Sequence, residues 1–121
     1  MSRLIINNFN EFAQHIGQEL GVSDYLTITQ EQIDLFADAT LDHQWIHVDT
    51  ERARTESPYK STIAHGYLNL SVLPYLWGQI LEVNNVKMLV NYGIETQGIR
   101  LAMMAIGVVR CGTRASEAIL K

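Results

Sequence analysis

The segment FADATLDHQWIHVD, residues 36–49, sets the interpretation of this chain, together with TIAHGYL at residues 62–68. Within the first segment, Asp42 and His47 lie five residues apart, in a polar and aromatic stretch without helical periodicity. Helical patterns flank this stretch on both sides. We therefore expect a loop between two helices that brings both side chains to one place.

Asp42 and His47 suit general acid-base chemistry. A carboxylate can accept a proton or a hydrogen bond from water, and an imidazole exchanges a proton near neutral pH. The alternative is structural, with Asp42 capping a turn and His47 stacking on Trp45. The spacing alone leaves both interpretations open.

Gly66, in the second segment, lies near the start of a predicted helix, where backbone amides lack an acceptor within the helix. Such amides can bind an oxyanion, and a glycine lets a substrate carbonyl approach the backbone closely. The alternative is a glycine that allows close packing of a helix on a strand. The neighbouring His65 either contacts a substrate or is a helix-start histidine satisfied by the backbone.

Two helices are predicted in the first third of the chain. Apolar residues at spacings of three and four predict an amphipathic helix over residues 9–20, ended by Gly21. Thr29 and Gln32 have the spacing of a capping box. They predict a second helix that starts there and runs to about Ala39.

The third helix is predicted to be the long, central one. Ser61 or Thr62 can cap it, and apolar residues on nearly every face place it inside the fold. Pro74 removes a backbone hydrogen bond and is expected to kink this helix near Leu70. Beyond it, alternating apolar residues predict a strand over residues 86–90.

Residues 36–49 and 62–68 together resemble the MaoC-like dehydratases, whose best-known members are (R)-specific enoyl-CoA hydratases. The resemblance is strongest over residues 28–92. It implies an α+β hot-dog fold in a single domain over residues 1–121, with a long central helix wrapped by a curved antiparallel sheet. It also implies a homodimer.

The same resemblance implies an activity. In that family an Asp and a His activate water for addition to a trans-2-enoyl thioester, and they match Asp42 and His47. The family's oxyanion donor, a backbone amide after the His-Gly pair, maps to Gly66, with His65 and Gln44 as further substrate-binding candidates. The implied reaction converts trans-2-enoyl-CoA into (R)-3-hydroxyacyl-CoA, with CoA as part of the substrate and no separate cofactor.

The chain departs from the family pattern at several positions. Leu41 replaces a glycine that usually precedes the Asp, and Gln44-Trp45 stands where many members have Asn-Pro, a variant associated with one subgroup. A hydroxyl that some members carry eight residues after the helix glycine falls at Pro74 here. Residues 93–121 are atypical. Within them, residues 101–121 leave room for at most one or two short strands, so we expect a sheet that is incomplete at the C-terminus.

Three other functions stay open at this stage. A hot-dog acyl-CoA thioesterase would direct the water to the thioester carbonyl, and an acyl-thioester-binding or truncated subunit would not catalyse at all. The third is a metal site, although we expect no metal, because two of the candidate histidines would need a helical turn to share a face. Its candidate ligands are Asp42, His43, His47, Asp49 and His65.

The composition of the chain limits its possible fold, partners and location. The 121 residues, 47% hydrophobic and 18% charged, are typical of one globular core. A net charge of -4 without a basic stripe argues against nucleic acid as a partner. The single cysteine excludes an internal disulfide. Without an apolar block of signal-peptide length we expect a cytoplasmic protein, and residues 67–81 are too interrupted to span a membrane.

Overall fold

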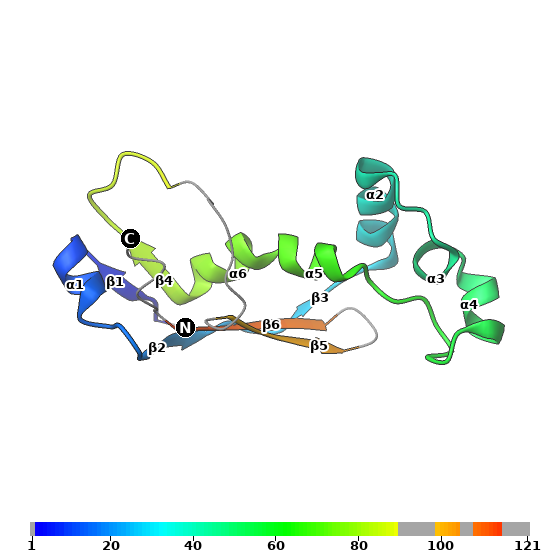
Figure 1. Cartoon of the computed structure of the whole chain (residues 1–121), viewed down its shortest axis with the longest axis horizontal. Coiled ribbons are helices and arrows are strands. Elements are labelled where there is room, and N and C mark those ends of the chain that lie inside the picture. Colours follow the sequence, from blue (N-terminus) through cyan, green and yellow to red (C-terminus); the bar gives the residue numbers. More distant parts are fainter. Residues whose placement is uncertain (1, 90–98, 105–107, 115–121) are drawn as a thin grey trace. The chain divides into compact units, whose positions relative to one another are not determined.

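The structure, a computed structural model, describes residues 2–89, 99–104 and 108–114. The chain forms two compact units, whose helices and strands are labelled in Figure 1. Unit 1 consists of Met1–Asp24, Pro74–Leu101 and Arg110–Lys121, and unit 2 consists of Tyr25–Leu73 and Ala102–Val109. The prediction of a single domain over the whole chain stays a prediction.

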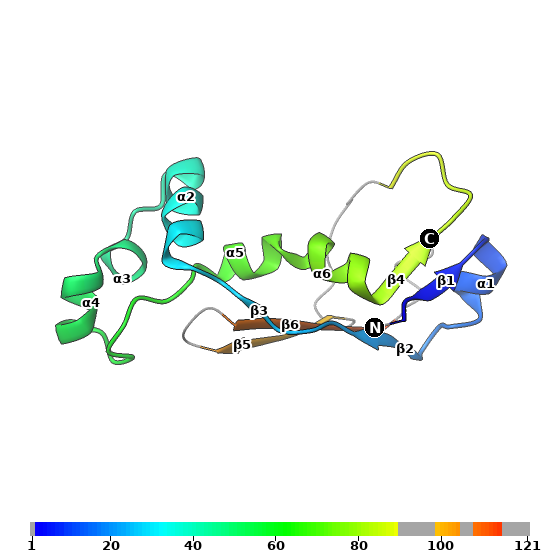
Figure 2. The ribbon, with the colours of Figure 1, turned by 180° about the vertical axis from the view of Figure 1, so that it is seen from behind.

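Unit 1 contains a pair of parallel strands. Strand β1 (Leu4–Ile6) pairs with β4 (Leu81–Val83), and the two lie side by side in Figures 1 and 2. Ile6 and Leu81 are buried there. Helix α1 (Phe9–Ala13) follows β1 and is capped by the Asn8 side chain, which accepts from the Glu11 amide.

The predicted helix over residues 9–20 is shorter than expected. It ends at Ala13, and Glu19–Val22 forms strand β2. Gly17, at φ 79°, turns the chain between them. Gly21 is a strand residue at φ 156° instead of a helix cap, and a Cβ at this position would lie 2.8 Å from Ile80 Cγ2. Glycine is therefore required there by both backbone conformation and close approach.

The predicted strand over residues 86–90 was wrong for the described residues 86–89, which form no strand; Val90 lies outside the described residues. Strand β4 forms earlier and takes the pairing with β1, and Asn84 donates its amide to Ile6 O at 2.8 Å. Asn85 then adopts φ 58°, which turns the chain away from a strand. The side chain of Met88 is 77% exposed, so it does not lie on the buried face that the predicted strand would have had.

Unit 2 contains the second predicted helix, α2 (Gln30–Thr40). The capping box is confirmed, because the Thr29 side chain accepts from the Gln32 amide while the Gln32 side chain accepts from the Thr29 amide. Ile33 and Ala37 form the buried face of α2. Two short helices follow, α3 (Trp45–Val48) and α4 (Thr50–Glu56).

The predicted central helix begins later than expected and is interrupted. Its first part, α5, spans Gly66–Ser71, and α6 spans Leu73–Ile80, so neither Ser61 nor Thr62 caps it. The break at Val72 agrees with the prediction for Pro74, which cannot donate to the Leu70 carbonyl. Tyr67 is 78% exposed and Tyr75 64%, so this helix is not buried on all sides within the chain.

The last described residues form two strands, as expected from their length. These are β5 (Ile99–Met104) and β6 (Val108–Arg114), which pair with each other. In unit 1, β6 runs antiparallel to β2, with Val22 opposite Gly112. In unit 2 it runs antiparallel to β3 (Leu26–Thr27), with Leu26 opposite Val109. The fold is thus α+β, with a small and partly open sheet.

None of the helices in the described part of the chain is both long enough and apolar enough to cross a membrane.

Candidate active site

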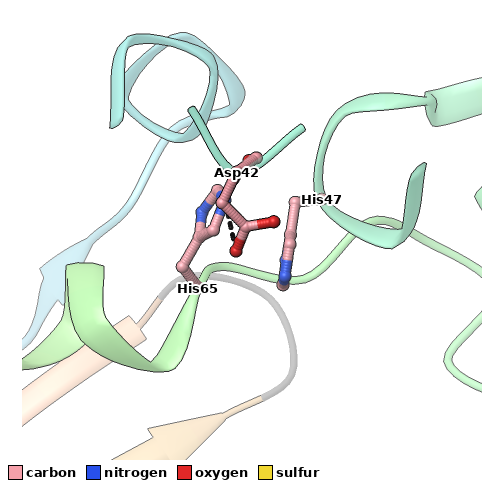
Figure 3. A group of neighbouring side chains, drawn as sticks. All are labelled: Asp42, His47 and His65. Atoms are coloured by element: carbon pink, nitrogen blue, oxygen red, sulfur yellow. Dashed lines mark hydrogen bonds and ion pairs between the residues drawn. The ribbon is translucent and has the colours of Figure 1, made fainter. Parts of the chain in front are cut away.

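Unit 2 brings together Asp42, His47 and His65, which Figure 3 shows as one group. A carboxylate oxygen and one nitrogen from each ring all lie within 4.8 Å of one another. Asp42 follows α2, His47 lies on α3, and His65 immediately precedes α5. The cluster therefore joins the two sequence segments that were expected to form one site.

Asp42 is positioned by the sharp end of α2. Leu41 adopts a left-handed conformation, φ 64° and ψ 18°, as the C-terminal cap of that helix. This turn directs Asp42 out of the helix, and its side chain stays 54% exposed. The Gln44 amide makes a long contact of 3.4 Å with Asp42 Oδ1. The carboxylate is thus accessible to water and only weakly tied by the protein.

His47 is held in one orientation by a backbone carbonyl. It lies on the short helix α3, where a loop had been predicted. Its Nδ1 is 2.8 Å from the Ile63 carbonyl oxygen, and Ile63 in turn donates its amide to Ile46 O at 3.1 Å. A carbonyl can only accept, so Nδ1 carries the hydrogen and Nε2 of the neutral ring has a lone pair. His47 can therefore accept a proton at Nε2.

Gln30 is a supporting residue that the sequence did not reveal. Its Nε2 donates to the His47 carbonyl at 2.8 Å, and its Oε1 accepts a hydrogen bond from the Thr62 hydroxyl. One side chain therefore connects α2 with both segments that position the His47 ring. Nothing in the sequence distinguished Gln30 except its place directly after the cap residue Thr29.

His65 is buried, with 3% of its surface exposed. Its Nε2 is 3.0 Å from the backbone oxygen of Asp42 and 3.8 Å from a carboxylate oxygen of the same residue. Its ring stacks on that of His47, with centroids 3.9 Å apart and an angle of 24° between the planes. One ring nitrogen of His65 thus contacts the backbone, in line with the second of its two interpretations, and its role at the site stays a prediction.

Gly66 and Gln44, the other two predicted substrate-binding residues, lie at the edges of this cluster. Gly66 is the first residue of α5, and a Cβ there would have no heavy atom of the described residues within 4 Å. Close packing against the described part of the chain therefore does not explain this glycine. Gln44 is exposed, and its side chain makes no capping hydrogen bond to α3.

Two of the five candidate ligands for a metal ion have other hydrogen-bond partners. His43 Nε2 lies 2.8 Å from Asp38 Oδ1, and Asp49 caps α4 by accepting from the Arg52 amide. The remaining donors, Asp42, His47 and His65, are close enough to be considered. The expectation that the site holds no metal stays a prediction.

The structure does not support the alternative in which His47 stacks on Trp45. Trp45 lies against Arg52, whose guanidinium carbon is 4.3 Å from the ring centroid. The ring that stacks on His47 belongs to His65 instead.

Comparison with known proteins assigns this chain to a family. The MaoC like domain matches residues 11–99. The 3-hydroxyacyl-thioester dehydratase Z of Mycobacterium tuberculosis is 52% identical over 85 residues, which are 70% of this chain and 56% of that protein.

Two rhizobial proteins are also similar. Nodulation protein N of Rhizobium leguminosarum bv. viciae is 52% identical over 81 residues, 66% of this chain and 50% of that protein. Nodulation protein N of Rhizobium meliloti is 41% identical over 108 residues, 88% of this chain and 63% of that protein. The chain thus spans between half and two-thirds of the length of these relatives. With a domain match over most of its residues, it belongs to the family of MaoC-like domains, which implies a hot-dog fold.

Proposed function

We propose that Asp42 and His47 activate a water molecule for addition to the double bond of a trans-2-enoyl thioester, or for its removal in the reverse direction. The observation that carries this proposal is the hydrogen bond from His47 Nδ1 to the Ile63 carbonyl, which leaves the lone pair of the neutral ring on Nε2, in a ring that lies close to the Asp42 carboxylate. The name of the mycobacterial relative, a 3-hydroxyacyl-thioester dehydratase, supports the same reaction type.

In the forward direction the water is held between the two side chains. The Asp42 carboxylate accepts one of its hydrogens, and His47 Nε2 faces the other. As the water oxygen bonds to the β-carbon, the carbon-carbon π electrons move toward the thioester and the proton lost by water is taken up by the pair. The pair then returns a proton to the α-carbon. The product is the 3-hydroxyacyl thioester, and the site regains its starting protonation.

Negative charge develops on the thioester oxygen during this reaction. The amide of Gly66 is the donor that the family resemblance assigns to that oxygen. In the structure it has no acceptor within α5, because it belongs to the first residue of the helix. The open space at Gly66 leaves room for a thioester carbonyl to approach the backbone. A donor there stabilises the transition state more than the ground state.

The proposed substrate is an enoyl-CoA and the proposed product the (R)-3-hydroxyacyl-CoA. No cofactor beyond the CoA of the substrate takes part, and no metal is required. We expect that EDTA treatment will leave the activity unchanged.

The product formed from crotonyl-CoA tests this proposal against its two alternatives. Chiral analysis should show (R)-3-hydroxybutyryl-CoA as the product. Release of free thiol without a hydroxyacyl product would make the protein a thioesterase instead. Binding of crotonyl-CoA without turnover would make it a non-catalytic acyl-thioester-binding subunit.

A further inference from the structure

His65 is a buried histidine whose two nitrogens have different surroundings. Its Nε2 is 3.0 Å from the backbone oxygen of Asp42, which can only accept, so the hydrogen must lie on Nε2. Its Nδ1 is buried and has no hydrogen-bond partner among the described residues. A hydrogen on that nitrogen would be a buried donor without an acceptor, which is costly. The geometry therefore selects the Nε2–H tautomer.

The ring of His65 also contacts two other rings. His47 stacks on it at 3.9 Å between centroids, and Phe36 lies tilted at 5.0 Å. These two contacts leave His65 little freedom to rotate. The ring of His47 is in turn fixed in its plane by Ile63 and across its face by His65.

We propose that His65 is a positioning residue for the pair that activates water. Its Nε2–H holds the backbone of Asp42, while its face orients the ring of His47 and lies against the imidazolium that forms when His47 accepts a proton. A buried side chain, 3% exposed, acts through these two residues and not by touching the substrate. The inference rests on the proposed hydratase function of Asp42 and His47.

Two substitutions separate the two contacts. His65→Gln places an amide donor near the position of Nε2 but removes the aromatic face. His65→Phe keeps the flat ring against His47 but removes the donor. We expect each variant to lower kcat by about 10-fold, and His65→Ala by about 10²-fold, since misplacement of catalytic groups slows the chemical step. KM should stay within about twofold in all three.

This split between kcat and KM distinguishes positioning from the other roles of His65. A residue that binds substrate would raise KM when it is replaced, and a purely structural residue would lower the folded fraction without changing kcat per folded molecule. The matched control is His43→Gln, because His43 lies on the same loop as Asp42 but pairs with Asp38. Either a raised KM or an unchanged kcat in the folded His65→Ala variant would overturn the proposal.

NMR provides a readout that does not depend on activity. In the wild-type protein at pH 7.5, ¹⁵N-detected ring couplings should show the proton of His65 on Nε2 and that of His47 on Nδ1. Ring-current shifts of the His47 protons should persist in His65→Phe and disappear in His65→Gln. A His65 proton on Nδ1, or His47 shifts that do not respond to His65→Gln, would overturn the proposal even in an active enzyme. If these signals are as expected but wild-type protein does not hydrate crotonyl-CoA, the proposed function fails and the positioning geometry stands.

Discussion

The Nδ1 atom of His47 donates to the carbonyl of Ile63, 16 residues further along the chain, at 2.8 Å. This hydrogen bond places the ring hydrogen of neutral His47 on Nδ1 and leaves the lone pair on Nε2. Because Ile63 belongs to the extended segment before α5, the two sequence segments that carry the family resemblance are joined by a contact that sets the protonation pattern of the proposed base.

Gln30 should matter for turnover although it lies outside the motif. Gln30→Ala removes the hydrogen bonds to the His47 carbonyl and from the Thr62 hydroxyl. Because the backbone that carries His47 is then less firmly held, we expect kcat to fall by about 10-fold at nearly constant KM. Asp34→Ala is the control, since it removes only the second acceptor of Gln30 Nε2. Equal effects of the two substitutions in steady-state kinetics would contradict this role.

The left-handed backbone conformation of Leu41 should lower the free energy of unfolding. This residue adopts φ 64° and is 82% exposed, so it has backbone strain with little burial to offset it. Leu41→Gly should raise the free energy of unfolding by about 0.5–1 kcal/mol, or Tm by about 3 °C, because glycine adopts this conformation freely. Leu41→Ala keeps a Cβ and should bring no such gain. Calorimetry that shows a less stable glycine variant would contradict the strain.

Gly66 offers a test of the oxyanion donor. Gly66→Pro removes the amide hydrogen, and the local backbone accepts proline, because His65 has φ -58° and ψ 139° and Gly66 is the first helical residue. We expect turnover to fall by about 10²- to 10³-fold.

Gly66→Ala is the matched control, since it keeps the amide and a Cβ there would meet nothing within 4 Å among the described residues. It should retain most of the activity. A folded proline variant with full activity would mean that the donor lies elsewhere.

The local signals in the sequence predicted structure well where neighbouring residues alone determine it. The capping box of Thr29 and Gln32 fixed the start of α2, and Pro74 predicted the interruption of the long helix. The residues that meet in the candidate site, Asp42 and His47, were also recognisable, because their types and spacing occur together.

The sequence could not predict features that depend on distant contacts. Leu20 continues the helical spacing of the apolar residues before it, yet Glu19–Val22 pairs with β6, and Gly21 packs against Ile80. Residues 86–89 alternate like a strand, but β4 already occupies the position beside β1. The roles of Gln30 and Ile63 in holding His47 follow from tertiary contacts that no local pattern encodes.

Self-association is a further prediction. Tyr67 is 78% exposed, and among the described residues β1 pairs with β4 alone. Unpaired strand edges and exposed aromatic side chains favour association, and a two-stranded sheet is marginally stable alone. We expect a homodimer in sedimentation at micromolar concentration. A monomer with a cooperative thermal transition would contradict this expectation.

Asp42 and His47 should act as one unit. Since both would hold the same water, the double variant Asp42→Asn, His47→Gln should lose much less activity than the product of the two single losses. Steady-state kinetics of all four forms gives this comparison. Losses that multiply would mean that the two side chains act on separate steps.

The most direct test of the account is the rate of crotonyl-CoA hydration in the single variants of the pair, with neighbours of the same type as controls. Asp42→Asn and His47→Gln should each lower turnover by about 10²-fold or more while the protein remains folded by circular dichroism. Asp38→Asn and His43→Gln change the adjacent, exposed hydrogen-bonded pair and should stay near the wild-type rate. Near-wild-type turnover in either Asp42→Asn or His47→Gln would contradict the assignment of the pair.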